Sequence, residues 1–432
     1  MRVLIVSSNR LRIPVPVFPS GPAYIAGAAL EAGHEVEAFD CFFSDNMEGE
    51  LVNIIRKLQP EVVGISIRNV HSGQLLNHQD FRGEVKEIVD IVKKASRAHI
   101  VLGGSGFNNF GCEWLEYLEL DYGIRGEGEV SFPLYLEELE KGGDIRTIPG
   151  SVYRENGDIH EVTKQFIEDL DGTPYAAFEL FDIDAYRQLG TFPSLITKKG
   201  CPFRCSYCPI SALEGTRYRL KSPERLADEV EHTMKACGVG MLSFNDNVFN
   251  FPKEHAEAVC RELIQRGLDV KWWTDAVNPV GMSLDFCLLM KEAGCMLPNL
   301  SVESGSPRIL RNMNRRYSQE QIVEAASNLE KAGIPFSISL LFGSPGETPE
   351  TVAETLDLMD RLPRAQVVFS TIGLNLEHYQ GILEDACRDG QLVDDKEMFE
   401  GAYYLSPYLS EDYIDELKDR LAEKDNWFVL GI

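Results

Sequence analysis

Residues 199–209 read Lys-Gly-Cys-Pro-Phe-Arg-Cys-Ser-Tyr-Cys-Pro, and this stretch decides which fold and chemistry the chain supports. It supplies three thiols within eight residues, from Cys201, Cys205 and Cys208. Three thiolates hold three irons of a four-iron cluster and leave the fourth iron open to an exchangeable ligand. Zinc sites usually take a fourth protein ligand, and the bacterial ferredoxin run spaces its cysteines two residues apart and ends in a fourth cysteine. Because neither pattern fits, we expect catalysis at an iron–sulfur cluster, with chance grouping or core packing of cysteines as the alternative.

The rest of the chain is typical of a reduced, globular protein. No apolar run approaches the roughly twenty residues of a membrane span, and the sequence opens without a signal peptide, so we expect a cytoplasmic protein. Thiols stay reduced in that compartment. The cysteines outside the cluster stretch are scattered and are interpreted as small buried hydrophobes. They are Cys41, Cys112, Cys237, Cys260, Cys287, Cys295 and Cys387.

The length of 432 residues allows two or three domains, and 44% hydrophobic with 25% charged residues is a globular composition. The formal net charge of -26 argues against a nucleic-acid partner, because phosphate binding needs clustered lysine and arginine. A solvated acidic surface that aids solubility is the simpler interpretation, and a basic substrate is the alternative.

The first part of the chain alternates strands and helices, which predicts a doubly wound α/β domain with a five-stranded sheet. Glycines follow the fourth and fifth strands, where open α/β sheets bind ligands. Glycines alone are weak evidence, because they also form ordinary turns. The expected strands cover residues 3–7, 35–39, 62–66, 99–103 and 122–125, and the expected helices cover 21–32, 51–58 and 83–98.

Together these features resemble the cobalamin-binding radical S-adenosylmethionine (SAM) family, of the class B methyltransferase type. The matching segments are Gly21-Pro-Ala-Tyr24, the Gly103-Gly104 turn and Arg125-Gly-Glu-Gly-Glu129, and the resemblance extends from residue 1 to about 360. It implies an N-terminal Rossmann-like domain that binds cobalamin. The cofactor contacts that it implies are Ser20, Gly21, Ser66, Arg68, Asn69, Gly103, Gly104, Gly126, Glu127 and Gly128.

The lower face of the corrin is expected to lack a histidine. The family's Asp-x-His-x-x-Gly run belongs in the loop after the first strand, and that loop has no histidine. His71 follows the third strand with its glycine one position early, and an ordinary loop histidine is the simpler interpretation. We therefore expect Arg68 and Asn69 to lie nearest the cobalt, although Arg68 is equally typical of a salt-bridged surface residue.

From about residue 192 a second run of βα units begins, and it resembles the six-unit partial barrel of radical SAM enzymes. Its first strand delivers the cysteine stretch at its carboxyl end, where barrel enzymes place their chemistry. The expected strands cover 194–197, 240–244, 270–274, 298–302, 336–340 and 366–370.

The resemblance also implies contacts to SAM. Tyr207 occupies the adenine position, and Asn245-Asp246 resembles the segment near the SAM amino group. Glu303 and Ser304 fall in Val302-Glu-Ser-Gly-Ser306, a family signature that approaches the ribose and amino acid. A helix cap is the alternative for Asp246, and a turn with a helix cap is the alternative for the other pair. The loop 342–348, which contains Pro-Gly, is interpreted as structural first.

The expected domains are a cobalamin-binding domain (1–140), a linker (141–190), the radical SAM partial barrel (191–370) and a C-terminal substrate or closure region (371–432). The apolar end, 427–432, is expected to dock on its own barrel, with partner binding as the alternative. Aromatic residues of the tail are expected to close the active site. Truncation after Ser370 is then expected to leave cluster and cobalamin binding largely intact.

The function implied is that of a cobalamin-dependent radical SAM enzyme with a [4Fe-4S] cluster. The first expectation is methylation of an unactivated carbon of a natural-product or lipid-like small molecule through a 5'-deoxyadenosyl radical. A rearrangement, ring contraction or cyclisation without methyl transfer is the alternative, and a non-catalytic cobalamin or redox sensor is a remote one. An external one-electron donor such as flavodoxin or ferredoxin is implied as a partner. Fold and cofactors do not identify the substrate.

Overall fold

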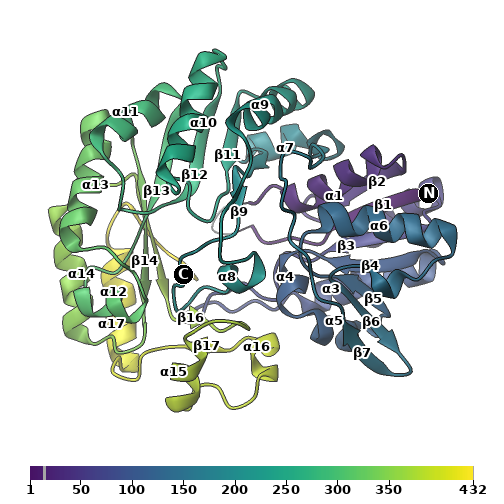
Figure 1. The fold of residues 1–432 in the computed structure, drawn as a ribbon. Helices are drawn as coiled ribbons and strands as arrows, with labels where there is room; N and C mark the ends of the chain where they lie inside the picture. Colours follow the sequence, from purple (N-terminus) through teal and green to yellow (C-terminus); the bar gives the residue numbers. More distant parts are fainter. Residues whose placement is uncertain (13–15, 432) are drawn as a thin grey trace. The chain divides into compact units, whose positions relative to one another are not determined.

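The computed structural model describes residues 1–12 and 16–431, and it divides into two compact units. The first unit comprises Met1–Ser72, Asp80–Pro193 and Lys235–Gly238. The second comprises Gly73–Gln79, Ser194–Met234 and the described chain from Val239 onward. Figure 1 traces the elements of both units along the sequence.

A seven-stranded sheet in the order β2-β1-β3-β4-β5-β6-β7 forms the centre of the first unit. Five strands are parallel, as the sequence predicts, but the antiparallel hairpin β6–β7 extends the sheet within the expected linker. The prediction of a five-stranded sheet was therefore wrong. Asn156-Gly157 forms the turn with positive φ at both residues, which is a hairpin signal in the sequence itself. The strands are β1 (Arg2–Ser7), β2 (Glu35–Asp40), β3 (Val62–Ser66), β4 (His99–Gly103), β5 (Tyr122–Ile124), β6 (Ser151–Glu155) and β7 (Asp158–Glu161).

The three helices that the sequence predicts are present with shifted ends, and further helices follow β4 and β5 and lie in the expected linker. The second helix begins four residues before its predicted start, because the Asn46 side chain caps it by accepting from the Gly49 amide. The third ends at Ala95, because Ser96 is extended. A buried cluster that includes Ile5, Val101 and Phe132 forms a core of this unit. The helices are α1 (Ser20–Glu31), α2 (Met47–Leu58), α3 (Arg82–Ala95), α4 (Ser105–Asn109), α5 (Gly111–Leu118), α6 (Gly128–Lys141) and α7 (Ile183–Gln188).

The second unit is built on a seven-stranded parallel sheet in the order β18-β15-β14-β13-β12-β11-β8. Six strands follow the predicted βα series. The seventh, β18, comes from the end of the chain and pairs with β15, so the apolar terminus docks on its own barrel as predicted. The strands are β8 (Ser194–Leu195), β11 (Met241–Phe244), β12 (Lys271–Val277), β13 (Cys295–Glu303), β14 (Ser337–Phe342), β15 (Val367–Ile372) and β18 (Trp427–Val429).

The helices of the second unit follow one another around the outside of its sheet (Figure 1). They bury one face of the strands, so alternate side chains such as Leu300, Ile338 and Val368 are inaccessible. The opposite, inner face stays partly exposed. The main helices are α9 (Pro223–Cys237), α10 (Lys253–Gln265), α11 (Leu284–Glu292), α12 (Pro307–Asn312), α13 (Gln319–Ala332), α14 (Pro349–Arg361) and α17 (Glu411–Ala422).

Residues Gly73–Gln79 lie between β3 and α3 in the chain but pack with the second unit. His78 Nδ1 lies 2.8 Å from the Tyr403 hydroxyl, and Leu75 packs against Gly373. Among the described residues, no helix is long and apolar enough to cross a membrane.

Candidate functional site

The cysteine stretch leaves the carboxyl end of β8 through a tight turn. Gly200 has φ +83°, and a Cβ there would meet the Arg217 carbonyl oxygen at 2.1 Å, so the turn requires glycine. The Cys201 amide donates to the Gly215 carbonyl at 3.0 Å, and β9 (Lys198–Lys199) pairs with β10 (Arg219–Leu220) beneath it. The start of the loop is therefore fixed by backbone contacts.

The three thiols lie close enough to influence one another's ionisation. Burial raises the pKa of Cys201 and Cys205, and it raises the pKa of Cys208 to about 12. Free thiolates are therefore disfavoured here, whereas bound iron would stabilise them. Among the described residues no three His, Cys, Asp or Glu side chains are close enough to hold a single metal ion. Three thiols in one loop suit a four-iron cluster, in which each thiolate binds a different iron.

A turn after α12 holds the cysteine loop from one side. The Asn314 side chain donates to the Arg204 carbonyl at 2.6 Å, and the Ser206 amide donates to the Met313 carbonyl at 3.1 Å. Asn314 adopts φ +57°, a conformation that Asn tolerates better than most residues. These two bonds flank Cys205, so the turn fixes the position of its backbone.

The C-terminal region holds the same loop through a second set of bonds. The Gln380 side chain donates to the Tyr207 carbonyl at 2.8 Å, and the Ile382 amide donates to the Ser206 carbonyl at 2.9 Å. The expectation that truncation after Ser370 leaves the cluster largely intact stays a prediction, and these bonds count against it, because the residues to be deleted contact the loop that carries the cysteines.

Asp246 is buried and fully engaged with the end of β8. Its carboxylate accepts from the Thr197 amide at 2.8 Å and the Thr197 hydroxyl at 2.6 Å, and it pairs with Lys198 at 2.8 Å. The next helix begins at Lys253, so Asp246 is not a helix cap. Asn245 is exposed beside it, and Asn247 donates to Glu214 at 2.6 Å. Contact of Asn245 and Asp246 with SAM stays a prediction.

Glu303 and Ser304 end β13 in different environments. Glu303 is buried in the left-handed region at φ +61°, an uncommon conformation for a side-chain-bearing residue that often marks a functional site. Its carboxylate forms an ion pair with Arg315. Ser304 is inaccessible, and its hydroxyl bonds the Thr355 hydroxyl at 3.1 Å and the Ser306 amide at 3.1 Å. These bonds fit the turn that the sequence left open as the alternative, and contact of Ser304 with SAM stays a prediction.

The loop after β14 is fixed by its own glutamate. Glu347 accepts hydrogen bonds from the amides of Gly343 and Ser344. Burial raises the pKa of Glu347 to about 7, and these backbone bonds only partly oppose the rise. Thr348 begins α14 in a capping box with Thr351. The contacts fit the structural interpretation of this loop.

The predicted cobalamin contacts gather at one edge of the first sheet. Ser66, Gly103 and the turn after β5 follow the carboxyl ends of neighbouring parallel strands. Arg68 and Asn69 are partly exposed after β3, and Gly21 is exposed in the first turn of α1 with open space around its Cα. Ser20, also half-buried, begins that helix. This edge is where an open α/β sheet binds a ligand, so the residues fit a corrin.

Some glycines at this edge serve the fold. Gly104 has φ +92°, and a Cβ there would meet the Ile67 carbonyl oxygen at 2.5 Å. Gly126 has φ +93° and donates its amide to the Asn108 side chain at 2.8 Å. A Cβ at Gly128 would meet Ile25 at 2.6 Å. The positive φ angles of Gly104 and Gly126 require glycine with or without a cofactor, whereas the end of the Ile25 side chain could move away from a Cβ at Gly128.

Two further predicted positions have protein partners. The Glu127 carboxylate accepts from the Ile167 amide at 2.6 Å. His71 is buried, and its backbone forms a bridge with Asp80. Cobalamin contact by Glu127, and the absence of a histidine below cobalt, stay predictions.

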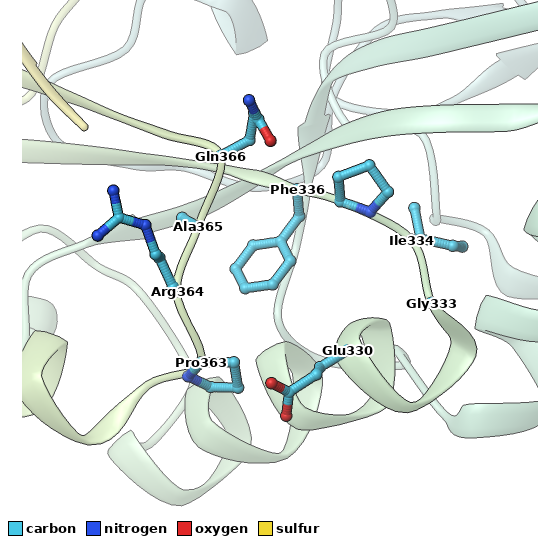
Figure 2. A pocket seen from close by; sticks show the side chains of 9 residues that line it. Glu330, Gly333, Ile334, Phe336, Pro363, Arg364, Ala365 and Gln366 are labelled. Atoms are coloured by element: carbon cyan, nitrogen blue, oxygen red, sulfur yellow. The ribbon is translucent and has the colours of Figure 1, made fainter. Parts of the chain in front are cut away.

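Two cavities lie away from these candidate sites. One, of about 330 Å³, precedes β14 and β15 at their amino ends, and Figure 2 shows Phe336 facing into it near Glu330 and Pro363. The other, of about 770 Å³, lies at the amino ends of β4 and β5 and is lined by His99 and Tyr122 among others. Parallel α/β folds place their chemistry at the opposite strand ends, so neither cavity is assigned a role.

Sequence reasoning missed the residues that support the loops. Asn314 and Gln380 were not singled out, because each acts on a segment distant in the sequence. Arg315 was also missed, although the run Asn314-Arg-Arg-Tyr317 directly after a short helix was a visible signal. Asn108, which binds the peptide of Gly126, had no signal in the sequence.

Two family matches identify the chain. Residues 195–359 match the radical SAM superfamily, and residues 9–136 match the B12 binding domain. The protein is a cobalamin-binding member of the radical SAM superfamily. Its cofactors are a [4Fe-4S] cluster, SAM and cobalamin, as the resemblance implied.

Relatives of this cobalamin-dependent radical SAM enzyme include methyltransferases. An uncharacterized methyltransferase of Pyrococcus horikoshii is 29% identical over 349 residues, which cover 80% of this chain and 73% of the relative. Tryptophan 2-C-methyltransferase of Streptomyces laurentii is 24% identical over 449 residues, which cover 88% of this chain and 73% of the relative.

A solved structure shows the same fold. The radical SAM methyltransferase TsrM from Kitasatospora setae, with cobalamin and a [4Fe-4S] cluster bound, superposes with a TM-score of 0.87 at 24% identity. The match covers 99% of this chain and 92% of TsrM. The predicted class, a Rossmann-like domain followed by a parallel βα sheet, is confirmed.

Proposed function

We propose that the enzyme methylates an unactivated carbon of a natural-product or lipid-like small molecule through a 5'-deoxyadenosyl radical. The observation that carries this proposal is the three-cysteine loop at the end of β8 in a chain that also has a B12-binding domain. A relative named for C-methylation of tryptophan supports carbon as the acceptor, and a hopanoid C-3 methylase, 24% identical over 336 residues, supports the lipid-like class.

In this proposal the chain supplies position and shielding, while the bound cofactors supply electron transfer, hydrogen abstraction and the methyl group. Cys201, Cys205 and Cys208 would bind the cluster. Tyr207, Asn245, Asp246, Glu303 and Ser304 would contact SAM. Ser20, Gly21, Ser66, Arg68, Asn69, Gly103 and the glycine turn 126–128 would contact cobalamin.

The substrate would lie on the inner face of the second sheet. Asn299 links three strands there, because its amide donates to the Asp275 carbonyl at 2.9 Å and the Ser339 hydroxyl at 2.8 Å. Phe369 and Phe428 add an aromatic surface, with ring centroids 6.2 Å apart. Polar and aromatic groups side by side suit a small organic molecule. An external flavodoxin or ferredoxin would supply electrons, and the acidic chain would not bind nucleic acid.

Labelled turnover tests the proposal. The anaerobically reconstituted enzyme would be supplied with methyl-labelled SAM, a reductant and candidate small molecules. We expect a product with one labelled methyl on carbon, together with S-adenosylhomocysteine and 5'-deoxyadenosine. Cys205→Ala should form none, and Cys387→Ala, at an exposed cysteine outside the loop, should keep full turnover. An altered product without the label, formed with 5'-deoxyadenosine alone, would contradict methyl transfer.

A further inference from the structure

Arg315 is a buried guanidinium next to the cysteine loop. It follows the turn that holds Cys205, and its own amide donates to the Leu310 carbonyl at 2.7 Å. The side chain is 9% exposed, so its charge is almost entirely removed from water. An arginine this buried is costly unless its charge and its donors are satisfied.

Its surroundings explain how the charge is tolerated. The guanidinium forms an ion pair with Glu303 at the strained end of β13. Its central carbon lies 5.8 Å from the ring centre of Tyr207 and 5.6 Å from that of Tyr317, within the range of cation–π contact. The Tyr317 hydroxyl donates to the Ser301 carbonyl at 2.8 Å, which fixes that ring to β13.

The guanidinium also lies beside the cysteine loop. It sits over the ring of Tyr207, which stands between Cys205 and Cys208 in the chain, and its positive charge opposes the rise in the pKa of Cys205 that burial causes. Arginine has five N–H donors, and among the described residues its Nε has no hydrogen-bond partner. One rigid group therefore contacts both the Tyr207 ring, in the loop that carries Cys205, and the Glu303 carboxylate. Lysine carries the same charge but lacks the planar, rigid set of N–H donors that a guanidinium has.

We propose that Arg315 is a positioning residue, which holds Cys205 and Glu303 in one arrangement and stabilises the negative charge of the reduced cluster. The proposal rests on the proposed function for the cluster at Cys205 and the SAM contact at Glu303. Reduction adds an electron to a cluster in a low-dielectric site, where a fixed positive charge beside a ligand favours the reduced form. Charged groups next to a ligand are among the means by which proteins set cluster potentials.

The test compares three variants of the full chain after anaerobic reconstitution. Arg315→Gln removes the charge, and Arg315→Lys keeps the charge but loses the planar set of donors. Arg316→Gln changes the exposed neighbour and is the matched control. The measurements are iron per chain, the midpoint potential of the cluster and the dissociation constant for SAM. None of them requires turnover.

For Arg315→Gln we expect a more negative potential and about tenfold weaker SAM binding, since Glu303 loses the partner that orients it. Arg315→Lys should keep a potential close to that of the unsubstituted protein and still bind SAM several-fold more weakly. Arg316→Gln should match the parent in every measurement. An Arg315→Gln protein with normal iron content and with unchanged midpoint potential and SAM affinity would overturn this inference and leave the proposed function untouched.

Arg315→Gln leaves the Glu303 carboxylate buried without its partner, and a buried unpaired charge can prevent folding. The pair Glu303→Gln and Glu303→Gln/Arg315→Gln removes that difficulty, because the double variant has no unpaired charge. A more negative potential in the double variant than in Glu303→Gln supports the inference, and equal potentials overturn it. If the unsubstituted protein takes up no iron, both the proposed function and this inference are wrong.

Discussion

The three thiols of the cysteine loop have different surroundings. Cys201 is buried, whereas Cys205 and Cys208 are half-buried. After burial, the positive charge of Arg315 has the largest effect on the pKa of Cys205, which it lowers. Since burial opposes ionisation of all three, assembly of a cluster must release their protons.

Changing any of the three cysteines to alanine should abolish SAM cleavage, because an iron loses its ligand and the cluster is no longer held. The parent protein should contain close to four irons per chain, measured after anaerobic reconstitution, and the variants clearly fewer. Cys387→Ala is the control, because that thiol is exposed and outside the loop. Close to eight irons in the parent, or undiminished cleavage by Cys205→Ala, would contradict the assignment.

Glu347 makes stability depend on pH. Its folded pKa of about 7 lies above the ordinary 4.5, so the folded state binds more protons than the unfolded state between those values. Stability is then lost as pH rises from about 4.5 to 7. Glu347→Gln should remove that loss and stabilise the protein at pH 8 by up to roughly 3 kcal/mol.

Chemical unfolding measured from pH 5 to pH 8 checks this expectation. Glutamine keeps an acceptor for the amides of Gly343 and Ser344 and stays neutral at every pH. Glu350→Gln is the matched control, since Glu350 is exposed in the same helix start. Parallel profiles for the parent and Glu347→Gln would show that the carboxyl is ionised throughout.

The turns that follow the strands of the first sheet contain glycines, and only those with space for a side chain can be replaced to test the ligand site. Replacing Gly104 strains the backbone and forces it against Ile67, so loss of cobalamin from such a variant would be ambiguous. Gly103 differs, because a Cβ there meets only the Ile124 carbonyl oxygen at 3.7 Å. Gly21 has open space and helical neighbours, where a larger residue favours the helix.

Gly21→Leu and Gly103→Leu should therefore expel cobalamin without unfolding the domain. The parent protein, supplied with hydroxocobalamin, should retain about one equivalent in the visible spectrum, and these variants well below half. Gly83→Leu, near the start of α3 with open space around it, is the matched control. Full retention by both variants would place the corrin elsewhere. Nitrogen superhyperfine splitting in the cobalt(II) spectrum would show that a histidine such as His71 binds the metal.

The segment around Gln380 is the element that links the C-terminal region to the cysteine loop. Gln380→Ala removes its bonds to the carbonyls of Tyr207 and Asn375, and such bonds contribute about 1 kcal/mol each. We expect the variant to fold but to lose iron several-fold faster to a chelator, measured by absorbance. Gln391→Ala is the control, because the Gln391 side chain bonds the backbone of Leu405 in the same region. Equal rates of iron loss in both variants would contradict a role in holding the loop.

At the scale of the whole molecule, the C-terminal tail is a structural part of the second unit. β18 completes its sheet, and residues 380–382 support the cysteine loop. Truncation after Ser370 should therefore reduce iron content below one half of the parent and expose the edge of β15. A truncated protein that retains four irons would show that the tail is a closure element and does not hold the cluster.

The sequence by itself determined the local features of this protein. Alternating strand and helix patterns predicted both parallel sheets, and the spacing of Cys201, Cys205 and Cys208 predicted the cluster chemistry, because each signal is contained in a few adjacent residues. The comparisons confirm the family and its cofactors. The hairpin β6–β7 was also readable from Asn156-Gly157, and the assignment of that stretch to a linker obscured it.

Only the tertiary structure decided which distant residues support the site. Arg315 and Gln380 approach the cysteine loop from positions more than a hundred residues away, and β18 pairs with β15 across the intervening tail. The physical reason is that a partner is set by packing in three dimensions, whereas sequence periodicity reports only which face of an element is apolar. The same limit explains Asp246 and Ser304, whose polar groups the folded chain uses for its own hydrogen bonds.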